Sequence, residues 1–281
     1  MGNSYHELQQ TTYNATVTHI KQITDHLAIH YYLPDEPMPK PEPGQYISMG
    51  LFNFENPTIA LSEPKLIRRA YSLSYSFDNE RSECLEVYLA KVPNGELTPK
   101  LFNLQVGDRL YITPKVFGHY TLPELSGNET LIFTSTGTGL APHLSMLKAS
   151  LNRCKRILLI DCVRYKADLG YYDLLKDIEK KHSHLSYIPI ATRDDKDKRY
   201  IQDIFQNDIL ENEYDVSIDK QTTHVFACGN PKMIGIPKKD RESGVYLFPE
   251  ETGLVEILIR KYGLEIHKTK LPGQIHFEKY W

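Results

Sequence analysis

The sequence predicts two domains, an antiparallel β-barrel followed by an α/β domain with a parallel sheet. The chain has 281 residues, which is enough for two hydrophobic cores. The first half contains many short strand-like stretches separated by turn signals, and this pattern is typical of a small antiparallel barrel. From Thr130 onward, apolar strands alternate with helical stretches, which indicates a parallel sheet. We place the boundary near Ser126-Gly127-Asn128, which gives domains at 1–127 and 128–281.

In the first half we expect one short helix among the strands. The expected strands are 11–18, 28–33, 45–50, 69–76, 84–91 and 110–113. The segment 97–104 is the expected helix, with Thr98 as its cap and Pro99 in its first turn. A helix begun in this way is also an anion site, although a plain capping Thr needs no ligand.

The second half alternates more regularly. The expected strands are 131–134, 156–162, 185–191, 223–228 and 274–277, and the expected helices are 142–151, 169–181, 201–210 and 254–262. The segment 234–253 interrupts the pattern and is predicted to be a surface insertion. Ligands of parallel sheets bind at the carboxyl ends of the strands. Arg164, Arg193 and Cys228 all follow or end predicted strands, as do the glycines after 134.

Composition and charge exclude several classes of protein. The net charge of −3 gives no reason to expect a nucleic acid partner. We expect no membrane span and no secretory signal, because the chain has no sufficiently long apolar run and its first residues are polar. Its four cysteines show no C-x-x-C spacing, so we expect neither a metal site nor an Fe–S cluster. These features predict a cytoplasmic protein with reduced thiols, and we expect a monomer.

The stretch Arg69-Ala70-Tyr71-Ser72-Leu73-Ser74 carries the first chemical signal. In a strand, Arg69, Tyr71 and Leu73 share one face and the serines share the other. A guanidinium suits a phosphate, an aromatic ring suits a flat cofactor, and a hydroxyl can bond a ring nitrogen. An ordinary strand with a solvated arginine explains the same residues.

The second signal is the glycine-rich stretch 134–142, Thr-Ser-Thr-Gly-Thr-Gly-Leu-Ala-Pro. It lies between a predicted strand and a predicted helix, and Pro142 suits the first helical turn. Backbone amides at such a turn bind phosphate. The stretch is neither a G-x-G-x-x-G motif nor a P-loop.

Taken together, the motifs of this chain resemble the ferredoxin–NADP reductase family, and most closely its bacterial flavodoxin/ferredoxin–NADP reductases. The matching stretches, in order, are Arg69–Ser72, Val92–Thr98, Gly137–Pro142, Cys228–Met233 and Glu278–Trp281. The resemblance implies an FAD-dependent oxidoreductase that moves electrons between NADP(H) and a one-electron carrier, ferredoxin or flavodoxin. Hydride transfer would occur at flavin N5, and the flavin itself supplies the redox chemistry.

By this resemblance, Arg69 and Thr98 bind the flavin pyrophosphate, Tyr71 packs on the isoalloxazine, and Ser72 bonds near N5. Leu73 belongs to the same flavin-binding strand. The terminal Trp281 would pack on the adenine part of FAD. Glu278 is a candidate for proton delivery, and His276 is a candidate for the residue that faces the flavin.

The resemblance places NADP(H) on the second domain. Thr136, Gly137, Thr138 and Gly139 would cradle its phosphates, and Cys228 would border the nicotinamide without acting as a nucleophile. The set that would clamp the 2′-phosphate is Arg164, Arg193 and Arg199. Solvated surface arginines remain the alternative, because the acids at 194, 195 and 197 weaken the local positive field. A buried packing cysteine is the alternative for Cys228.

Two other functions fit the same motifs. One is an NAD(P)H-dependent flavin reductase with a broader range of acceptors, such as quinones, free flavins or a haem protein. The other is a non-catalytic relic of the fold that binds a nucleotide. Arg69, Tyr71, Ser72, Gly137 and Gly139 together argue against the relic, because such a relic has no need of both sites.

Overall fold

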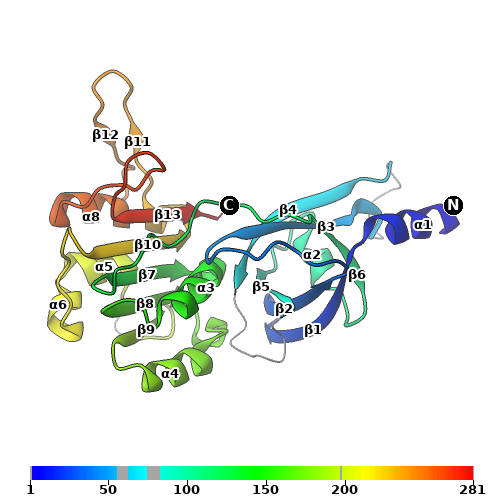
Figure 1. Ribbon diagram of the computed structural model, residues 1–281, viewed down its shortest axis with the longest axis horizontal. Coiled ribbons are helices and arrows are strands. Elements are labelled where there is room, and N and C mark those ends of the chain that lie inside the picture. The colour runs from blue at the N-terminus through cyan, green and yellow to red at the C-terminus, as the bar shows by residue number, and fades with distance from the viewer. Residues whose placement is uncertain (1, 56–62, 75–82, 197, 281) are drawn as a thin grey trace. The chain divides into compact units, whose positions relative to one another are not determined.

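The structure is a computed structural model that describes residues 2–55, 63–74, 83–196 and 198–280. The chain divides into two compact units (Figure 1). The first contains residues 1–121 together with 144–148, and the second contains residues 122–143 and 149–281. The bounds at 1–127 and 128–281 stay a prediction.

In its described part, the first unit is built on six strands. They are β1 (Ala15–Thr24), β2 (Leu27–Pro34), β3 (Tyr46–Phe52), β4 (Leu66–Ser74), β5 (Leu85–Ala90) and β6 (Arg109–Ile112). Every neighbouring pair is antiparallel, in the order β1-β2-β5-β4-β3-β6. Because β6 also pairs with β1, the ring of strands closes into a barrel.

The barrel is held together by aliphatic side chains that alternate along its strands. Ile47, Met49 and Leu51 of β3 are fully buried in one cluster with Val87 and Leu89 of β5. Burial of such a side chain is worth about 1.5–3 kcal/mol. The same period-two pattern predicts the barrel from the sequence, and the structure confirms it.

Within the described part of residues 2–121, the helices are α1 (Gly2–Thr12) and α2 (Thr98–Leu101), with a 3₁₀ turn at Asn53–Glu55. Helix α1 has no clear signal in the sequence, because its residues are mostly polar and carry no helical stripe. Leu8 packs against the barrel core, so tertiary contact stabilises a helix whose own pattern is weak.

A five-stranded parallel sheet forms the centre of the second unit. Its strands are β7 (Thr130–Thr136), β8 (Arg156–Val163), β9 (Leu185–Ala191), β10 (Thr223–Gly229) and β13 (Ile275–Lys279). Their order is β13-β10-β7-β8-β9, and all described pairs are parallel. This arrangement confirms the predicted α/β class. It also brings the carboxyl ends of all five strands to one edge, where the sequence predicts the nucleotide site.

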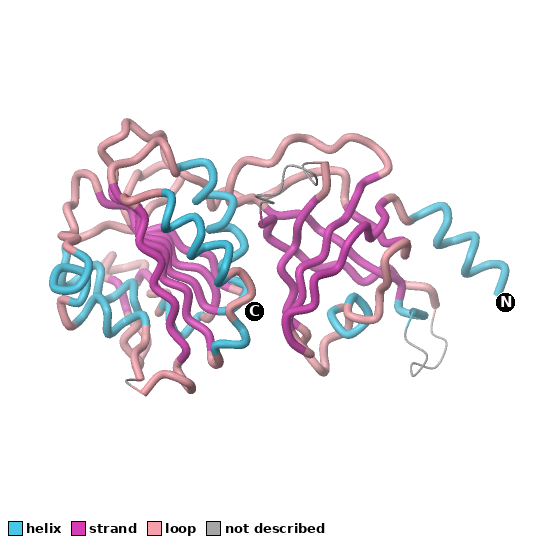
Figure 2. The backbone as a smooth tube through the Cα atoms, turned by 90° about the horizontal axis from the view of Figure 1, so that it is seen from below, coloured by secondary structure: helices cyan, strands magenta, loops and turns pink. Residues whose placement is uncertain are grey.

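Helices cover both faces of this sheet, as Figure 2 shows. They are α3 (Leu140–Ser150), α4 (Tyr172–Lys181), α5 (Ile201–Gln206), α6 (Ile209–Tyr214), α7 (Pro231–Ile234) and α8 (Leu254–Tyr262). The single helix predicted at 201–210 is divided, because Asp208 adopts a left-handed backbone with φ of 55°. Short 3₁₀ turns, η3 (Gly137–Gly139) and η4 (Lys166–Asp168), follow β7 and β8.

The predicted insertion contains a short hairpin, β11 (Lys238–Lys239) paired with β12 (Tyr246–Leu247). Figure 1 shows it standing away from the sheet, and Val245 and Leu247 are exposed. Across the described ranges, no helix combines the length and apolar character that crossing a membrane requires.

Acid should destabilise this fold through three buried histidines. Burial lowers the pKa of His30 to about 4, of His143 to about 3 and of His276 to about 2. The unfolded chain binds these protons near pH 6.5, so stability is full above that pH and falls as pH decreases towards the folded pKa values. Each group costs about 1.4 kcal/mol per pH unit in that window. Urea unfolding at a series of pH values from 7.5 to 4 measures the slope.

His143→Leu should make this slope shallower, whatever it does to absolute stability, because it removes one proton-binding site of the unfolded chain. The matched control is His119→Gln, which changes an exposed histidine. Equal slopes in wild type and His143→Leu would contradict the assignment of acid sensitivity to buried histidines.

Candidate functional site

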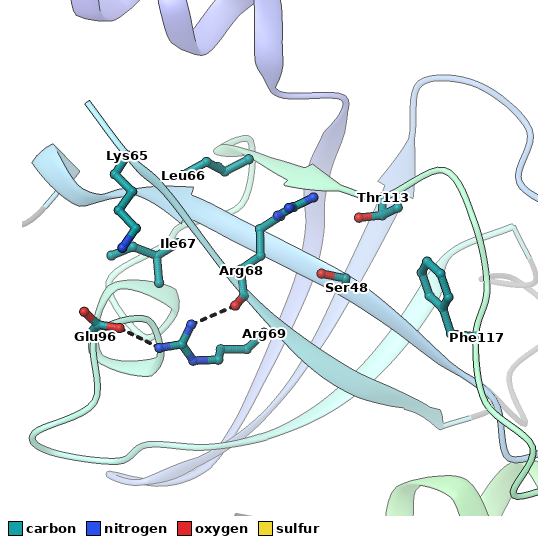
Figure 3. A pocket seen from close by; sticks show the side chains of 9 residues that line it. All are labelled: Ser48, Lys65, Leu66, Ile67, Arg68, Arg69, Glu96, Thr113 and Phe117. Carbon is teal, nitrogen blue, oxygen red and sulfur yellow. Dashed lines mark hydrogen bonds and ion pairs between the residues drawn. The ribbon is translucent and has the colours of Figure 1, made fainter. Parts of the chain in front are cut away.

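A cavity of about 500 Å³ opens on the barrel beside β4 (Figure 3). Its lining comes from β3, the start of β4, the loop before α2 and the segment after β6. The lining residues are Ser48, Lys65, Leu66, Ile67, Arg68, Arg69, Glu96, Thr113 and Phe117. Of the residues predicted to hold a flavin, Arg69 is the one found in this described lining. The other lining residues were not predicted from the sequence, although Arg68 directly precedes Arg69.

The charges of this cavity favour an anion. Lys65, Arg68 and Arg69 line it with a single carboxylate, Glu96. Arg69 Nη2 lies 2.5 Å from Glu96 Oε2, and Arg69 Nη1 donates to the carbonyl of Arg68 at 2.8 Å (Figure 3). The two side chains of this ion pair are 54% and 63% exposed, so the pair contributes at most about 1 kcal/mol. A phosphate can therefore displace Glu96 from Arg69 at small cost.

The next residues of β4 turn towards the barrel core. Tyr71 lies opposite Ile47, packs against the core cluster and is half-buried. Burial raises the pKa of its phenol, although the Arg69 guanidinium opposes the shift. Ser72 and Leu73 are both buried. On this strand Arg68, Arg69 and Ala70 are thus the exposed residues, and Tyr71 is partly exposed.

Thr98 does not cap α2 as predicted. It is the first residue of the helix, and the cap position belongs to Leu97, which makes no side-chain capping bond. The Thr98 hydroxyl instead accepts a hydrogen bond from the Val92 N–H at 2.8 Å and lies 3.3 Å from the Val92 carbonyl. Because the preceding turn brings Val92 back over the helix start, the hydroxyl closes that turn. Pro99 does lie in the first helical turn, as predicted.

In the second unit, the glycine-rich turn packs backbone to backbone against the end of β10. A Cβ at Gly139 would lie 2.4 Å from the Cys228 carbonyl oxygen. A Cβ at Gly229, whose φ is +123°, would lie 2.2 Å from Thr136 Oγ1. The same Thr136 oxygen accepts a hydrogen bond from the Asn230 N–H at 2.7 Å. Glycines are therefore required here by the close approach of two backbone segments.

Between these turns and α3, Gly137 has φ of +55° and Thr138 is buried. The 3₁₀ turn η3 leads directly into the eleven residues of α3, with Pro142 in the first turn of the helix. The N-terminus of α3 therefore lies at the carboxyl edge of the sheet, next to the end of β7. Its backbone amides have the arrangement that binds phosphate.

The neighbouring strands β10 and β13 bring two predicted residues together. Cys228 pairs in register with Glu278, and the Tyr280 N–H donates to the Gly229 carbonyl at 2.9 Å. Burial first, and then the Glu278 carboxylate, raise the pKa of the Cys228 thiol well above its ordinary value. A raised pKa makes a thiol a poorer nucleophile, because the thiolate is the form that attacks. Trp281 lies outside the described residues.

His276 lies deeper in the same strand. Its ring stacks on Phe226 with centroids 4.3 Å apart and on His267 at 4.5 Å, and His276 Nε2 lies 3.1 Å from His224 Nδ1. This buried packing accounts for its conformation without a flavin. The described residues include no group of three or more His, Cys, Asp or Glu side chains arranged to hold a metal ion.

The loops after β8 and β9 join the two arginines predicted to bind a 2′-phosphate. The Arg193 N–H donates to the Arg164 carbonyl at 2.9 Å, and the Thr192 N–H donates to the Val163 carbonyl at 3.0 Å. Arg193 Nη1 also donates to the Tyr165 hydroxyl at 3.1 Å, and its guanidinium lies 5.7 Å from the centre of that ring. The sheet therefore holds both arginines at one edge.

Arg199 has a different setting from the other two arginines. Its Nη1 lies 3.1 Å from both carboxylate oxygens of Glu213. This ion pair joins Arg199 to α6, whereas the guanidinium of Arg193 contacts the loop after β8.

Sequence reasoning missed Asp161 and Tyr165 near these arginines. Asp161 is a fully buried carboxyl in β8, where burial raises its pKa to about 7. A lone acid within an apolar strand was the available signal. Because Tyr165 directly follows Arg164, the sequence predicts that it lies in the same loop. Its contact with Arg193 could not be predicted from the sequence.

Comparison with known proteins gives this geometry a context. Residues 133–239 match the model of the oxidoreductase NAD-binding domain. The chain is 33% identical over 250 residues to a flavodoxin/ferredoxin–NADP reductase of Buchnera aphidicola, covering 85% of this chain and 87% of the relative. It is 34% identical over 174 residues to the flavodoxin/ferredoxin–NADP reductase of Escherichia coli, covering 60% and 69% of the two chains.

The chain belongs to the flavodoxin/ferredoxin–NADP reductase family. It is an oxidoreductase of that family, as the resemblance of its motifs implies. Among solved structures, the fold matches a ferredoxin NADP⁺ reductase from Neisseria gonorrhoeae with bound FAD and NADP. The TM-score is 0.75 at 22% identity, and the match covers 95% of this chain and 97% of that one. At 22% identity, this match supports the fold of the chain alone.

The close approach of the two turns predicts a sharp difference between neighbouring glycines. Gly139→Ala should destabilise the second unit by about 1–3 kcal/mol, because its methyl group meets the backbone of Cys228. The control, Gly137→Asn, should cost little, since that position has open space and a left-handed backbone that Asn accepts. Thermal unfolding followed by circular dichroism compares them. Equal melting temperatures for the two variants would contradict the packing described here.

Proposed function

We propose that this chain is an FAD-dependent ferredoxin/flavodoxin–NADP reductase that transfers electrons between NADP(H) and a one-electron carrier. The observation that carries the proposal is the joining of Arg164 and Arg193 at the carboxyl edge of the sheet, beside the glycine-rich turn and α3. Cations there suit a 2′-phosphate, whereas sites for NAD present an acid to the ribose. Membership of the family supports the same reaction.

The residues of the barrel fit a flavin dinucleotide. The cavity beside β4 has three cations for a pyrophosphate, and its one carboxylate, Glu96, is held only by an exposed ion pair. Tyr71 offers an aromatic surface at the same strand. In this proposal Arg69 binds the pyrophosphate, Tyr71 packs on the ring system, and Ser72 and Leu73 shape the strand below it. Thr98 closes the adjoining turn.

The second unit holds NADP(H) in this proposal. The amides of the turn at 136–139 bind its phosphates, and Arg164 and Arg193 bind the 2′-phosphate. Cys228 and Glu278 are paired on neighbouring strands of the sheet. In this proposal the uncharged Cys228 side chain borders the nicotinamide, and the Glu278 carboxylate takes part in proton transfer. When bound, FAD exchanges a hydride with the nicotinamide and passes electrons singly to the carrier.

The partner in this proposal is a separate ferredoxin or flavodoxin. The relatives at 33% and 34% identity are named for both carriers, which supports this class of partner without choosing between them. A monomeric state and a cytoplasmic location remain predictions of the sequence.

Purified protein should show flavin absorption bands that bleach rapidly on anaerobic addition of NADPH and slowly with NADH. Arg164→Ala and Arg193→Ala should each raise the KM for NADPH about 10- to 100-fold, because each removes a charged hydrogen bond worth about 1.5–3 kcal/mol. The KM for NADH should change little in both variants. Stopped-flow spectroscopy of the flavin absorption bands follows the reaction.

Protein that stays colourless after addition of FAD would refute the flavin assignment. Equal losses for NADPH and NADH in the arginine variants would refute the 2′-phosphate role. Rapid reduction of quinones or free flavin, with no reduction of ferredoxin or flavodoxin, would replace the carrier by a broader class of acceptor.

The cavity on the barrel predicts opposite effects for its two paired charges. Arg69→Ala should weaken FAD binding about 10- to 100-fold, because the pyrophosphate loses a charged donor. Glu96→Gln should strengthen it about two- to fivefold, since no carboxylate then competes for Arg69. Titration of FAD onto apo-protein, followed by quenching of flavin fluorescence, measures both. Weaker binding in Glu96→Gln would contradict the assignment of this cavity to the pyrophosphate.

A further inference from the structure

We propose that the hairpin of β11 and β12, together with the turn at 268–271, binds this protein to an anionic lipid surface. We call the surface formed by residues 238–247 and 268–271 the basic tip. Figure 1 shows its hairpin standing away from the parallel sheet. Its residues differ from those of both candidate sites, so the inference does not rest on the proposed function.

Exposed apolar side chains gather on the basic tip. Among the described residues, four large hydrophobic side chains are more than half exposed. Three of the four are Val245 and Leu247 of the hairpin and Leu271 of the turn, which are 58%, 57% and 65% exposed. The fourth, Val106, lies in the other unit. Exposed apolar side chains that cluster in this way mark a surface that binds another surface.

The same two segments carry five exposed cations. They are Lys238, Lys239, Arg241, Lys268 and Lys270. Within the described ranges, none of the five pairs with a carboxylate, whereas the neighbouring helix α8 has its Arg260 and Lys261 in ion pairs. The charges of the five cations are therefore available to an external anion.

The acids of the hairpin do not cancel these charges. They are Asp240 and Glu242. Asp240 Oδ1 accepts from the Ser243 N–H and from the Ser243 hydroxyl, both at 2.7 Å, and these bonds lower the pKa of the carboxyl. Asp240 thus closes the loop of the hairpin, and five cations outnumber two acids. Because salt screens charges beyond about 10 Å, this local excess counts for more than the net charge of −3.

Contacts within the basic tip hold its two segments together. The ammonium groups of Lys239 and Lys268 lie 5.9 Å and 5.8 Å from the centre of the Tyr246 ring, so this ring joins the hairpin to the turn. Lys268 and Leu271 exchange two backbone hydrogen bonds of 2.9 Å, which close the turn. The charged and apolar side chains are therefore presented on a formed surface, which lowers the ordering cost of binding.

The composition of the basic tip favours lipid over a protein partner. Interfaces between proteins are depleted in lysine, and their strongest contacts come from Trp, Tyr and Arg more often than from Leu and Val. The basic tip instead has four lysines and three exposed aliphatic side chains. Lysines attract anionic headgroups without a fixed geometry, and aliphatic side chains enter the boundary between headgroups and acyl chains. An anionic lipid surface is therefore the occupant that fits these residues.

Co-sedimentation of the full chain with lipid vesicles tests the inference. Wild type should bind phosphatidylcholine vesicles that contain about 30% phosphatidylglycerol and should not bind pure phosphatidylcholine. Binding should disappear at about 0.5 M NaCl. The double variant Lys239→Gln/Lys268→Gln should bind about 25-fold more weakly, since each cation near such a surface contributes about fivefold. Leu247→Ser/Leu271→Ser should weaken binding about 3- to 10-fold.

Two control variants match these changes in charge and in exposure. Lys180→Gln/Lys181→Gln removes two lysines from the end of α4, and Val106→Ser replaces a valine that is 63% exposed. Both should bind the anionic vesicles as wild type does. All four variants should keep the wild-type melting temperature, so that a loss of vesicle binding is not a loss of fold.

Equal binding to neutral and anionic vesicles would overturn the inference, as would no binding to either at about 0.1 M salt. Equal losses in the tip variants and in their controls would remove the lipid contact from the hairpin. Polyglutamate tests the other kind of occupant. Wild type that binds polyglutamate but no vesicles, with loss of this binding in Lys239→Gln/Lys268→Gln, would overturn the inference in favour of an acidic protein partner.

Discussion

The close packing of two backbone turns at the carboxyl edge of the parallel sheet is the constraint on which the nucleotide site depends. Gly139 and Gly229 have no side chains, so the turn after β7 reaches the turn after β10, and the Thr136 hydroxyl accepts the Asn230 N–H between them. This contact fixes where α3 begins. It also leaves the amides of η3 at the edge where β8 and β9 deliver their arginines. A protein interior packs too densely to absorb even one added methyl group at such a contact.

Electrostatic competition is a second feature shared by both candidate sites. On the barrel, Glu96 holds Arg69, and on the parallel sheet, Asp195 holds Lys166. Each ion pair is at least partly exposed, so each is weak compared with a charged bond to phosphate. The acids keep the cations in place and lower the net positive field.

Much of the fold could be predicted from the sequence because its signals are local. The period-two alternation around Val87 and the helical stripe of Leu254–Tyr262 each depend on burial of one face, and both elements formed as expected. Helix α1 escaped prediction because its stability comes from contact with the barrel rather than from its own pattern. The division of the helix predicted at 201–210 also escaped, since a left-handed aspartate carries no reliable signal.

By itself, the sequence determined the fold class and the family. It also determined that Arg69 lies on a strand and that Gly137, Arg164 and Arg193 follow strands. Motifs and strand ends can be predicted in this way because they depend on neighbouring residues. The tertiary structure alone decided which charges meet. It paired Arg69 with Glu96, Arg199 with Glu213, and Lys166 with Asp195. It also showed that the Thr98 hydroxyl closes a turn with Val92 and does not cap the helix. The physical reason is that an ion pair is set by distances between side chains from separate loops, and strand register brings those loops together in a way that local pattern does not encode.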